Sequence, residues 1–479
     1  MSAKRPIRRL LSGLFACALG VSLLAGCGTT PEPTAPASPG GTQNASQSGQ
    51  SPLRVLSVTP KALQSTQDLA DWAVRSAAKG ANDFAFRLGA ALLAENADDN
   101  FVCSPVSVWL PLAALVNATD DAHRDELLSA LGAQGVSGAD LNTAASRMLY
   151  NLTRQDERDF WEGVVARSGG SADTLTGKER EELERLGYDP LQIANAVFVD
   201  SGVTLRQDFA QTFADDYRGS VMNVDFKSQQ AVDAVNQWAS DNTGGLIDDI
   251  VQSFDPKTVA AIANAIYFSD GWNAEFDPAA TQAGTFHGAG GDGAANFMLR
   301  QGDGLTYYED DALQAMPLYF LHGGAMWVLL PKNGDARGLL SSMTTDYFAA
   351  IQSSAAGATG KLLLPRFSLE NGLELSDALK ALGVPLFDKK SAPLTGGLLQ
   401  ENIHVWLSSA TQQALIKVDE KGTTAAAVTV MAADGASLPV HTAPFEMICD
   451  HPFAFILCAD TADGGSQVLF TGVVGAIDD

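Results

Sequence analysis

The sequence predicts an α+β fold rather than an alternating α/β fold. Amphipathic helical patterns are concentrated between residues 84 and 245, whereas most of the long apolar strand patterns lie after residue 259. Such separation of helices from strands along a chain is typical of the α+β class. No second linker interrupts the chain after about residue 60, which predicts one large domain over residues 61–479.

The first 26 residues have the pattern of a secretory signal. Four basic residues lie within positions 4–9, and positions 10–25 are almost wholly apolar. This run is shorter than the ~20 residues that a membrane-spanning helix needs, and a basic head before a short apolar body is typical of export. The signal ends in Leu24-Ala25-Gly26-Cys27, which resembles the lipobox of bacterial lipoproteins. The resemblance implies that a lipid on Cys27 anchors the exported protein at the bacterial cell envelope, outside the cytoplasmic membrane. The alternative is an ordinary signal that happens to end in cysteine.

Residues 27–60 are expected to form a flexible linker. From Gly28 to about Pro52 the chain consists mainly of Thr, Pro, Ser, Gly, Gln and Ala, without apolar periodicity. Such a segment buries too little apolar surface to offset the entropy of ordering it. It therefore predicts a stalk that holds the folded domain away from the membrane.

The chain is strongly acidic, with a formal net charge of −25. The signal contains four basic and no acidic residues, so the remainder has 27 Lys and Arg against 56 Asp and Glu, a charge of −29. Nucleic-acid binding depends on Lys and Arg that neutralise phosphates. The balance therefore predicts that no nucleic acid is a partner.

Local patterns predict several helices. Residues 84–92 follow an amphipathic stripe. Ser104-Pro105 predicts a helix start with Ser104 as its cap, and Pro111 predicts a kink further on. Further helices are expected from Thr119 to Leu131, where a glycine follows, and around Val232–Trp238. A charged segment at about residues 153–187, with a helical stretch over 178–186, is expected to be an insertion into the same domain.

The predicted strands are apolar on both faces, which is typical of strands covered by other layers. They are Ile193–Val199, Val259–Phe268, Met326–Leu330, Lys361–Phe367, Leu415–Val418, Pro452–Leu457 and Val468–Val474.

Three cysteines remain when Cys17 of the signal and Cys27 are set aside. Cys103, Cys449 and Cys458 each lie in apolar sequence, which favours buried thiols. One disulfide with a third, free thiol is the alternative.

No local pattern indicates an enzyme. The six histidines show no His-Glu-x-x-His spacing, and neither a Cys-x-x-Cys pair nor a Gly-x-Ser-x-Gly elbow occurs. Acidic pairs such as Asp248-Asp249 are expected to be solvated in so acidic a chain. We therefore expect no catalytic residue, metal or cofactor; the alternative is a nucleophile and a histidine brought together from distant positions.

The segment from Glu420 to Val430 has the most unusual composition. After Lys421 it contains only glycine, alanine, threonine and valine. Because burial of an unpaired charge is costly, this composition favours a segment that can enter a β-sheet; a loose loop between two strands is the alternative. With Thr423 facing inward, alternation gives the inward set Thr423, Ala425, Ala427, Thr429 and Met431.

This segment resembles the hinge of the serpins, protease inhibitors with a mobile reactive loop. Five further motifs occur in the family's order and extend the resemblance from about Ala81 to Val474. They are Asn100–Ser107, Val235–Ile247, Asn264–Phe276, Leu364–Phe367, and Pro452-Phe453 with Phe470–Val474.

The resemblance implies a serpin-like α+β fold with three β-sheets, about nine helices and an exposed reactive loop, in a monomer. It also implies a suicide-substrate mechanism. The protease cleaves the loop and forms an acyl-enzyme, the loop inserts into the large sheet, and the protease is trapped in a covalent complex. The hinge residues implied are Glu420, Gly422, Thr423, Ala425, Ala427 and Thr429.

The family's spacing from Glu420 places the reactive bond between Ala436 and Ser437. An alanine before the bond suits the shallow pocket of an elastase-like or subtilisin-like serine protease; papain-like cysteine proteases are a further class. The segment up to Pro452 is a little long for the family, which leaves Ala433, Leu438 and His441 as alternatives.

The resemblance also implies two control regions. Ser104, Ser107 and Asn264 would lie in the shutter, a hydrogen-bond cluster that controls opening of the large sheet, and Trp272 in the breach, where insertion begins. Gln412 occupies the position of the family's shutter histidine. Its amide both donates and accepts, so the cluster can persist.

These features predict an inhibitor of serine proteases. Two other functions use the same fold. One is a non-inhibitory surface binding protein, and the other is a loop that proteases cut as a plain substrate.

Overall fold

The computed structural model describes residues 54–55, 61, 72–169, 174–186, 190–243, 245, 247, 250–408, 410–423, 444–461 and 465–477. The chain divides into two compact units, Met1–Leu53 with Trp161–Tyr188, and Arg54–Phe160 with Asp189–Asp479. The expected signal, Cys27 and nearly all of the linker lie outside the described residues.

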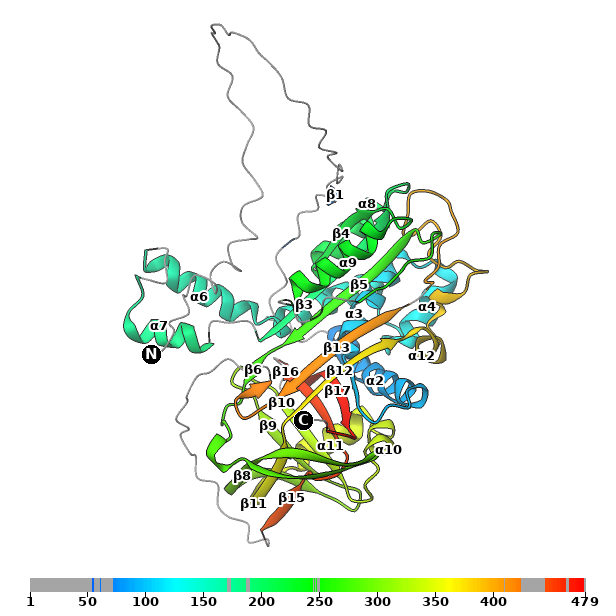
Figure 1. Ribbon diagram of the computed structural model, residues 1–479. Coiled ribbons are helices and arrows are strands. Elements are labelled where there is room, and N and C mark those ends of the chain that lie inside the picture. Colours follow the sequence, from blue (N-terminus) through cyan, green and yellow to red (C-terminus); the bar gives the residue numbers. More distant parts are fainter. Residues whose placement is uncertain are drawn as a thin grey trace, which may run out of the picture. The chain divides into compact units, whose positions relative to one another are not determined.

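The expected α+β class with three sheets is confirmed, and the described residues form eleven α-helices (Figure 1). The helices are α2 (Trp72–Glu95), α3 (Pro105–Leu115), α4 (Asp121–Ala130), α5 (Gly138–Leu152), α6 (Gln155–Arg167), α7 (Gly177–Leu186), α8 (Gln207–Tyr217), α9 (Gln229–Asn242), α10 (Ala336–Ser341), α11 (Thr345–Ser354) and α12 (Ser376–Ala381).

The smaller unit contains α7 and most of α6. Without α6 and α7, nine of the eleven described helices remain, the number that the resemblance implied. Its small core consists of Val164 and Leu175, with Trp161, Val165 and Leu183 packed against them. Thr176 and Glu179 cap α7 reciprocally: the Thr176 amide donates to Glu179 Oε2 at 2.9 Å, and the Glu179 amide donates to Thr176 Oγ1 at 3.3 Å. The sequence indicated α7 but not α6.

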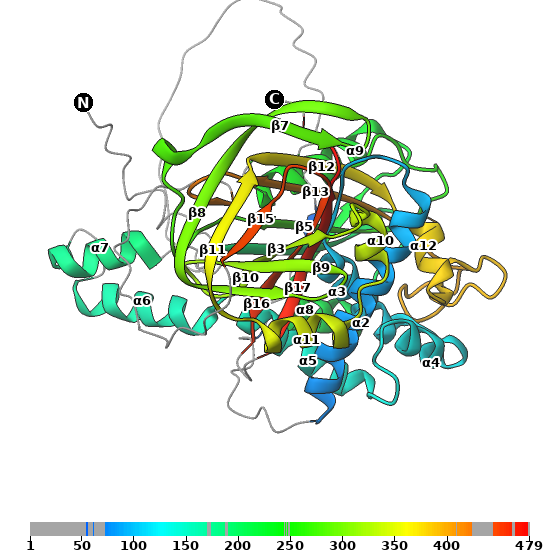
Figure 2. The same cartoon turned by 90° about the horizontal axis from the view of Figure 1, so that it is seen from below.

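The largest sheet contains nine strands, eight from the C-terminal half of the chain and one early strand. Its order is β15 (Phe445–Ile448), β11 (Ala356–Pro365), β8 (Gly291–Glu309), β9 (Leu313–Tyr319), β10 (Ala325–Pro331), β16 (Phe453–Asp460), β17 (Ser466–Val474) and β2 (Phe101–Cys103), and β7 (Gln282–Gly288) pairs with β8. Figure 2 shows α2, α10 and α11 beside this sheet. Phe101, Phe453, Phe455 and Phe470 fill the core here and are fully buried.

Two four-stranded sheets position the candidate site. One has the order β1 (Arg54–Val55), β4 (Gly219–Val224), β3 (Leu191–Asp200), β5 (Ala260–Phe268). The other has the order β12 (Phe367–Glu374), β13 (Thr411–Val418), β14 (Gly422–Thr423), β6 (Asp270–Gly271). Since β6 follows β5 after one residue, the two sheets meet at this end.

A gap in strand pairing separates these sheets. β5 and β13 lie side by side in both views (Figures 1 and 2). Within the described residues, however, no ladder of hydrogen bonds joins them, and only the two residues of β14 pair between β13 and β6. The edges of β5 and β13 therefore leave their backbone groups available to a further strand.

Three local predictions were wrong in detail. Ser104 is the N-cap residue of α3 and Pro105 begins the helix, as expected, but the Ser104 side chain makes no capping hydrogen bond, because its hydroxyl donates to the Leu469 carbonyl instead. The helix expected from Thr119 begins at Asp121, where the side chain of Asp120 accepts from the His123 amide. The strand expected over Lys361–Phe367 is broken at Arg366 into β11 and β12, after Pro365, which has no amide hydrogen to donate.

Among the described residues, none of the helices combines the length and apolarity required to cross a bilayer.

Candidate functional site

The candidate site is the end of the gap where β5 continues into β6, and the carboxylate of Glu420 is its most heavily bonded group. Arg366 Nε lies 2.8 and 2.9 Å from the two Glu420 carboxylate oxygens, and Thr281 Oγ1 donates to Oε1 at 2.6 Å. Glu420 is buried. Burial by itself raises the pKa of this carboxyl, but the hydrogen bonds from Arg366 and Thr281 outweigh it, and the pKa is lowered.

Trp272 fixes the chain on either side of Glu420. Its indole Nε1 donates to the Asp419 carbonyl at 2.9 Å, and its backbone amide donates to the Lys421 carbonyl at 2.8 Å. The Trp272 ring stacks on Phe320 with centroids 4.9 Å apart. The side chain assigned to the breach by resemblance thus contacts the segment that leads into the hinge.

The hinge residues Gly422 and Thr423 are already strand residues. Thr423 pairs with Val418 of β13 on one side and with Asp270 of β6 on the other, and Gly422 pairs with Gly271. Thr423 is completely buried. The Asp419 amide donates to the Gly422 carbonyl at 3.0 Å, which closes the turn between β13 and β14.

Glycine at position 422 permits this close approach. A Cβ there would lie 2.1 Å from the Asp270 carbonyl oxygen and 2.8 Å from Gly271 Cα. Any side chain would therefore push the hinge away from β6.

Three of the four residues assigned to the shutter come together in one buried cluster. Gln412 Nε2 donates to Ser107 Oγ at 2.6 Å and to the Ser104 carbonyl at 2.7 Å, and Gln412 Oε1 accepts from the Ser104 amide at 2.9 Å. Ser107 Oγ also donates to the Ser104 carbonyl at 2.9 Å. The cluster ties β13 to the start of α3.

Asn264 does not join this cluster. Its Nδ2 donates to Asn195 Oδ1 at 2.8 Å, on the opposite strand β3, because the register of β3 and β5 pairs these two residues. Its Oδ1 is buried without a hydrogen-bond partner. On the β5 side of the gap, the structure therefore leaves one acceptor unused.

Four residues of the site were not identified from the sequence. Arg366 lies inside a recognised motif, but nothing local indicates that it pairs with Glu420, 54 positions away. Thr281 gave no signal. Asp270 and His322 gave none either, and they form a buried pair beside the hinge.

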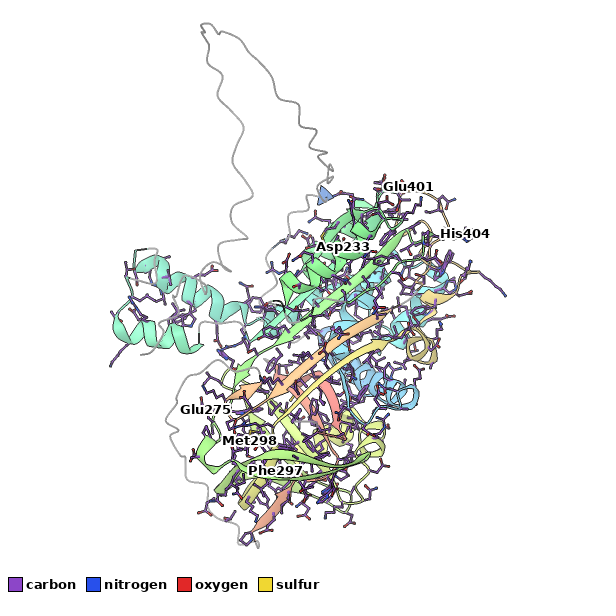
Figure 3. All side chains as sticks on the ribbon, in the orientation of Figure 1. Asp233, Glu275, Phe297, Met298, Glu401 and His404 are labelled. Carbon is purple, nitrogen blue, oxygen red and sulfur yellow. The ribbon has the colours of Figure 1, made fainter. Side chains whose placement is uncertain are left out.

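Several predicted site residues lie outside the described residues. These are the hinge residues Ala425, Ala427 and Thr429, and the bond between Ala436 and Ser437. The part of the chain that the structure describes contains no cluster of His, Cys, Asp and Glu suited to a metal ion. Figure 3 shows the side chains on the ribbon, with Glu275, Phe297 and Met298 among those labelled.

The three cysteines of the domain are buried free thiols. Burial raises the pKa of Cys103 and of Cys458 to about 12, and it also raises the pKa of Cys449. Thiolate is the reactive form of cysteine, so none of the three is suited to act as a nucleophile.

Comparison with known proteins gives one consistent result. Residues 79–476 match the model of the family described as Serpin (serine protease inhibitor). The chain is similar to Serpin-Z7 of Hordeum vulgare, with 28% identity over 405 residues that cover 82% of this chain and 94% of the relative. Serpin-Z1A of Triticum aestivum is 30% identical over 413 residues, with coverage of 82% and 94%.

A similar solved structure is the native state of tengpin, a thermophilic serpin. Its TM-score is 0.68 at 22% identity, and the match covers 88% of this chain and 98% of tengpin. At this identity the likeness bears on the fold alone.

Proposed function

The chain belongs to the serpin family, and from that membership we propose that it is a suicide inhibitor of serine proteases that traps its target by inserting a cleaved loop between β5 and β13. Serpins are in general non-enzymatic protease inhibitors. The same insertion would also trap papain-like cysteine proteases, whose acyl-enzyme is a thioester.

The observation that carries the proposal is the state of the hinge. Gly422 and Thr423 are paired at one end of the gap between β5 and β13, whose facing edges form no ladder with each other within the described residues. The sequence that follows Thr423 contains only threonine, alanine and valine up to Val430. It can continue the strand between β5 and β13 without burying a charge.

The chemistry belongs to the protease. Its serine Oγ attacks the carbonyl carbon of the residue before the cut bond, which we place at Ala436. An ester to Ala436 forms, the bond to Ser437 breaks, and the new amine of Ser437 carries away a proton from the protease's base. Hydrolysis of that ester would free the protease. Insertion must therefore be faster than the attack of water.

Insertion is favourable because it completes unfinished pairing. Successive residues of an added central strand form ladder hydrogen bonds alternately with its two neighbours, and each bond contributes about 0.5–1.5 kcal/mol net. Alternate side chains become buried on one face. Pairing of the inserted loop with the facing edges of β5 and β13 therefore lowers the free energy of the inhibitor, and this pairing becomes possible once the loop is cut.

The target class follows from the residue before the bond. Alanine at position 436 fits a shallow pocket and gives no partner to the acidic pocket of trypsin-like proteases. We therefore propose elastase-like or subtilisin-like targets. The lipid on Cys27 would hold the inhibitor, as a monomer, at the outer side of the cytoplasmic membrane.

The test is incubation of the purified full-length chain with an elastase-like and a subtilisin-like protease, followed by denaturing electrophoresis. A band at the summed mass that survives denaturant is expected, and N-terminal sequencing of the released peptide should begin at Ser437. Clipped protein without that band would favour a plain substrate. An intact loop with both proteases would favour a non-inhibitory binding protein.

A further inference from the structure

A buried acid–base pair lies directly beneath the seated hinge. Asp270 Oδ1 is 2.7 Å from His322 Nδ1, and Asp270 Oδ2 accepts from the His322 backbone amide at 3.2 Å. Both side chains are only 1% exposed. The two residues are called the breach latch below.

One partner of the breach latch is the residue against which the hinge pairs. Asp270 is the register partner of Thr423, and its amide donates to Thr423 Oγ1 at 3.4 Å. Its carbonyl oxygen lies so close to Gly422 that no side chain fits between them. The position of the Asp270 backbone therefore decides whether β14 can form.

The other partner is held by the nine-stranded sheet. His322 lies in the turn between β9 and β10, where the Phe320 backbone amide donates to the Gly324 carbonyl at 3.1 Å. The Gly324 amide donates to Asp460 Oδ2 of β16 at 2.8 Å, which ties the turn to the next strand. The same turn also contacts β6, because the Leu321 amide donates to the Gly271 carbonyl at 2.8 Å. The turn thus fixes β6 from the side opposite the hinge.

Burial of a carboxylate and an imidazole in this space costs hydration free energy. Two apolar side chains of similar volume would pack here without losing hydration. What a directional pair adds is orientation, since two hydrogen bonds to one carboxylate fix both the side chain and the backbone of Asp270.

We propose that the breach latch keeps β6 in position to hold Gly422 and Thr423 in register, so that loop insertion starts from a strand already begun. The proposal rests on the inhibitory function proposed above. Asp270 and His322 are positioning residues: they act through the Asp270 backbone on the hinge and do not touch the protease.

The consequence concerns how trapping competes with hydrolysis of the acyl-enzyme. When Gly422 and Thr423 are already in register, the residues that follow them can join the strand one after another once the loop is cut. Without the latch, Gly422 and Thr423 must first find the edges of β13 and β6, and water has longer to attack. Loss of the latch is therefore expected to increase the number of inhibitor molecules cleaved per protease trapped, while the rate of loop cleavage stays the same.

The first test needs no protease. Hydrogen exchange of the segment 419–423 is measured by mass spectrometry in the wild-type full chain, His322→Ala, His322→Asn and His123→Ala. We expect exchange of this segment to be about tenfold faster in His322→Ala. His322→Asn should restore it, because the asparagine amide can donate to Asp270 Oδ1.

His123→Ala is the matched control. It removes another Asp–His pair, with 2.8 Å between His123 Nδ1 and Asp120 Oδ1, at the start of α4. It should leave exchange of the hinge unchanged. Equal exchange in wild type and His322→Ala would overturn the latch, and so would equally fast exchange in His123→Ala. If His322→Ala does not fold, Asp270→Asn replaces it and is judged by the same comparison.

The second test measures stoichiometry on an active target. His322→Ala should require about threefold to tenfold more inhibitor per protease than wild type, with His322→Asn close to wild type. A stoichiometry equal to that of wild type would overturn the role in insertion. Absence of any trapped complex with the wild-type chain would refute the proposed function, and hydrogen exchange would still decide whether the latch seats the hinge.

Discussion

Gln412 and Ser104 exchange two hydrogen bonds between β13 and the start of α3. The Ser104 amide donates to Gln412 Oε1 at 2.9 Å, and Gln412 Nε2 donates back to the Ser104 carbonyl at 2.7 Å. An amide therefore does here what two separate polar side chains would otherwise do. It satisfies a buried donor and a buried acceptor at the residue before a helix.

Replacement of Gln412 by leucine should destabilise the domain. The change leaves the Ser104 amide and the Ser107 hydroxyl without this partner in a buried place, a loss of about 2–4 kcal/mol in the free energy of unfolding. Gln412→His keeps one donor and one acceptor in the neutral ring, so its loss should be smaller. Chemical denaturation measures both, and equal midpoints for wild type and Gln412→Leu would contradict the role of the cluster.

Glu420 should make stability depend on pH in the acid range. Burial alone raises the pKa of this carboxyl, but the bonds from Arg366 and Thr281 lower it below its ordinary value of 4.5. A pKa lowered by folding gives stability that is present above about pH 4.5 and is lost as the pH falls through the folded value. The thermal midpoint of wild type should exceed that of Glu420→Gln at neutral pH, and the difference should shrink below pH 4.5.

Glu446→Gln is the control for the pH experiment. Glu446 also pairs with a cation, Lys361, at 3.0 Å, but its side chain is largely exposed. Exposed pairs contribute little, so this variant should follow wild type at every pH. A difference between wild type and Glu420→Gln that did not change with pH would contradict the assignment.

Thr423→Arg should turn the inhibitor into a substrate. Thr423 is completely buried between β13 and β6, and an arginine there would bring an unpaired charge into the sheet. Proteases should still cut the loop, and the denaturant-resistant complex should fall at least about tenfold. Thr423→Ser, which keeps the hydroxyl, should behave like wild type. Equal complex formation by the arginine variant would refute insertion.

Ala436→Arg should move reactivity toward trypsin-like proteases. Their acidic pocket binds arginine before the cut bond, whereas an alanine there is bound poorly. The association rate with trypsin should rise by about two orders of magnitude or more, while Ala433→Arg serves as the position control. If Ala433→Arg gains reactivity and Ala436→Arg does not, the bond lies three residues earlier.

Cys27→Ser should release the protein from membranes. Acyl chains gain about 0.8 kcal/mol per buried CH₂ group, and without Cys27 there is no thiol to carry them. Fractionation of cells that express each form should move the serine variant from the membrane to the soluble exported fraction. Its retention in the membrane would argue against a lipid on Cys27.

The sequence predicted those parts of the molecule that depend on short-range patterns. The helices α2 and α9 follow from apolar stripes, and the small, uncharged residues after Lys421 favoured a segment that is able to enter a β-sheet. These two inferences needed only about a dozen neighbouring residues. The roles of the hinge and of Gln412 came instead from the resemblance to serpins, which supplied the spacing from Glu420.

Contacts between distant strands could not be predicted in this way. The pairs Arg366–Glu420 and Asp270–His322 join positions 54 and 52 residues apart, and no local pattern indicates that the two members of either pair meet. The bond from Asn264 to Asn195 depends on the register of β3 and β5, which a shift of one residue would change. Thr423 likewise pairs with Asp270, which lies 153 positions away along the chain.

Because the three thiols are buried, their reaction with an alkylating reagent can report on opening of the domain. A chain that begins after the predicted signal and carries Cys27→Ser keeps cysteine only at positions 103, 449 and 458, all buried in the described structure. Alkylation of any of them therefore records an opening event. Cys449 follows directly after β15, an edge strand whose last partner residue, Leu363, accepts the hydrogen bond of the Cys449 amide at 2.9 Å. Detachment of this edge strand would expose Cys449 to alkylation first, whereas global unfolding would expose all three thiols together. The pattern of labelled cysteines would therefore distinguish the two events.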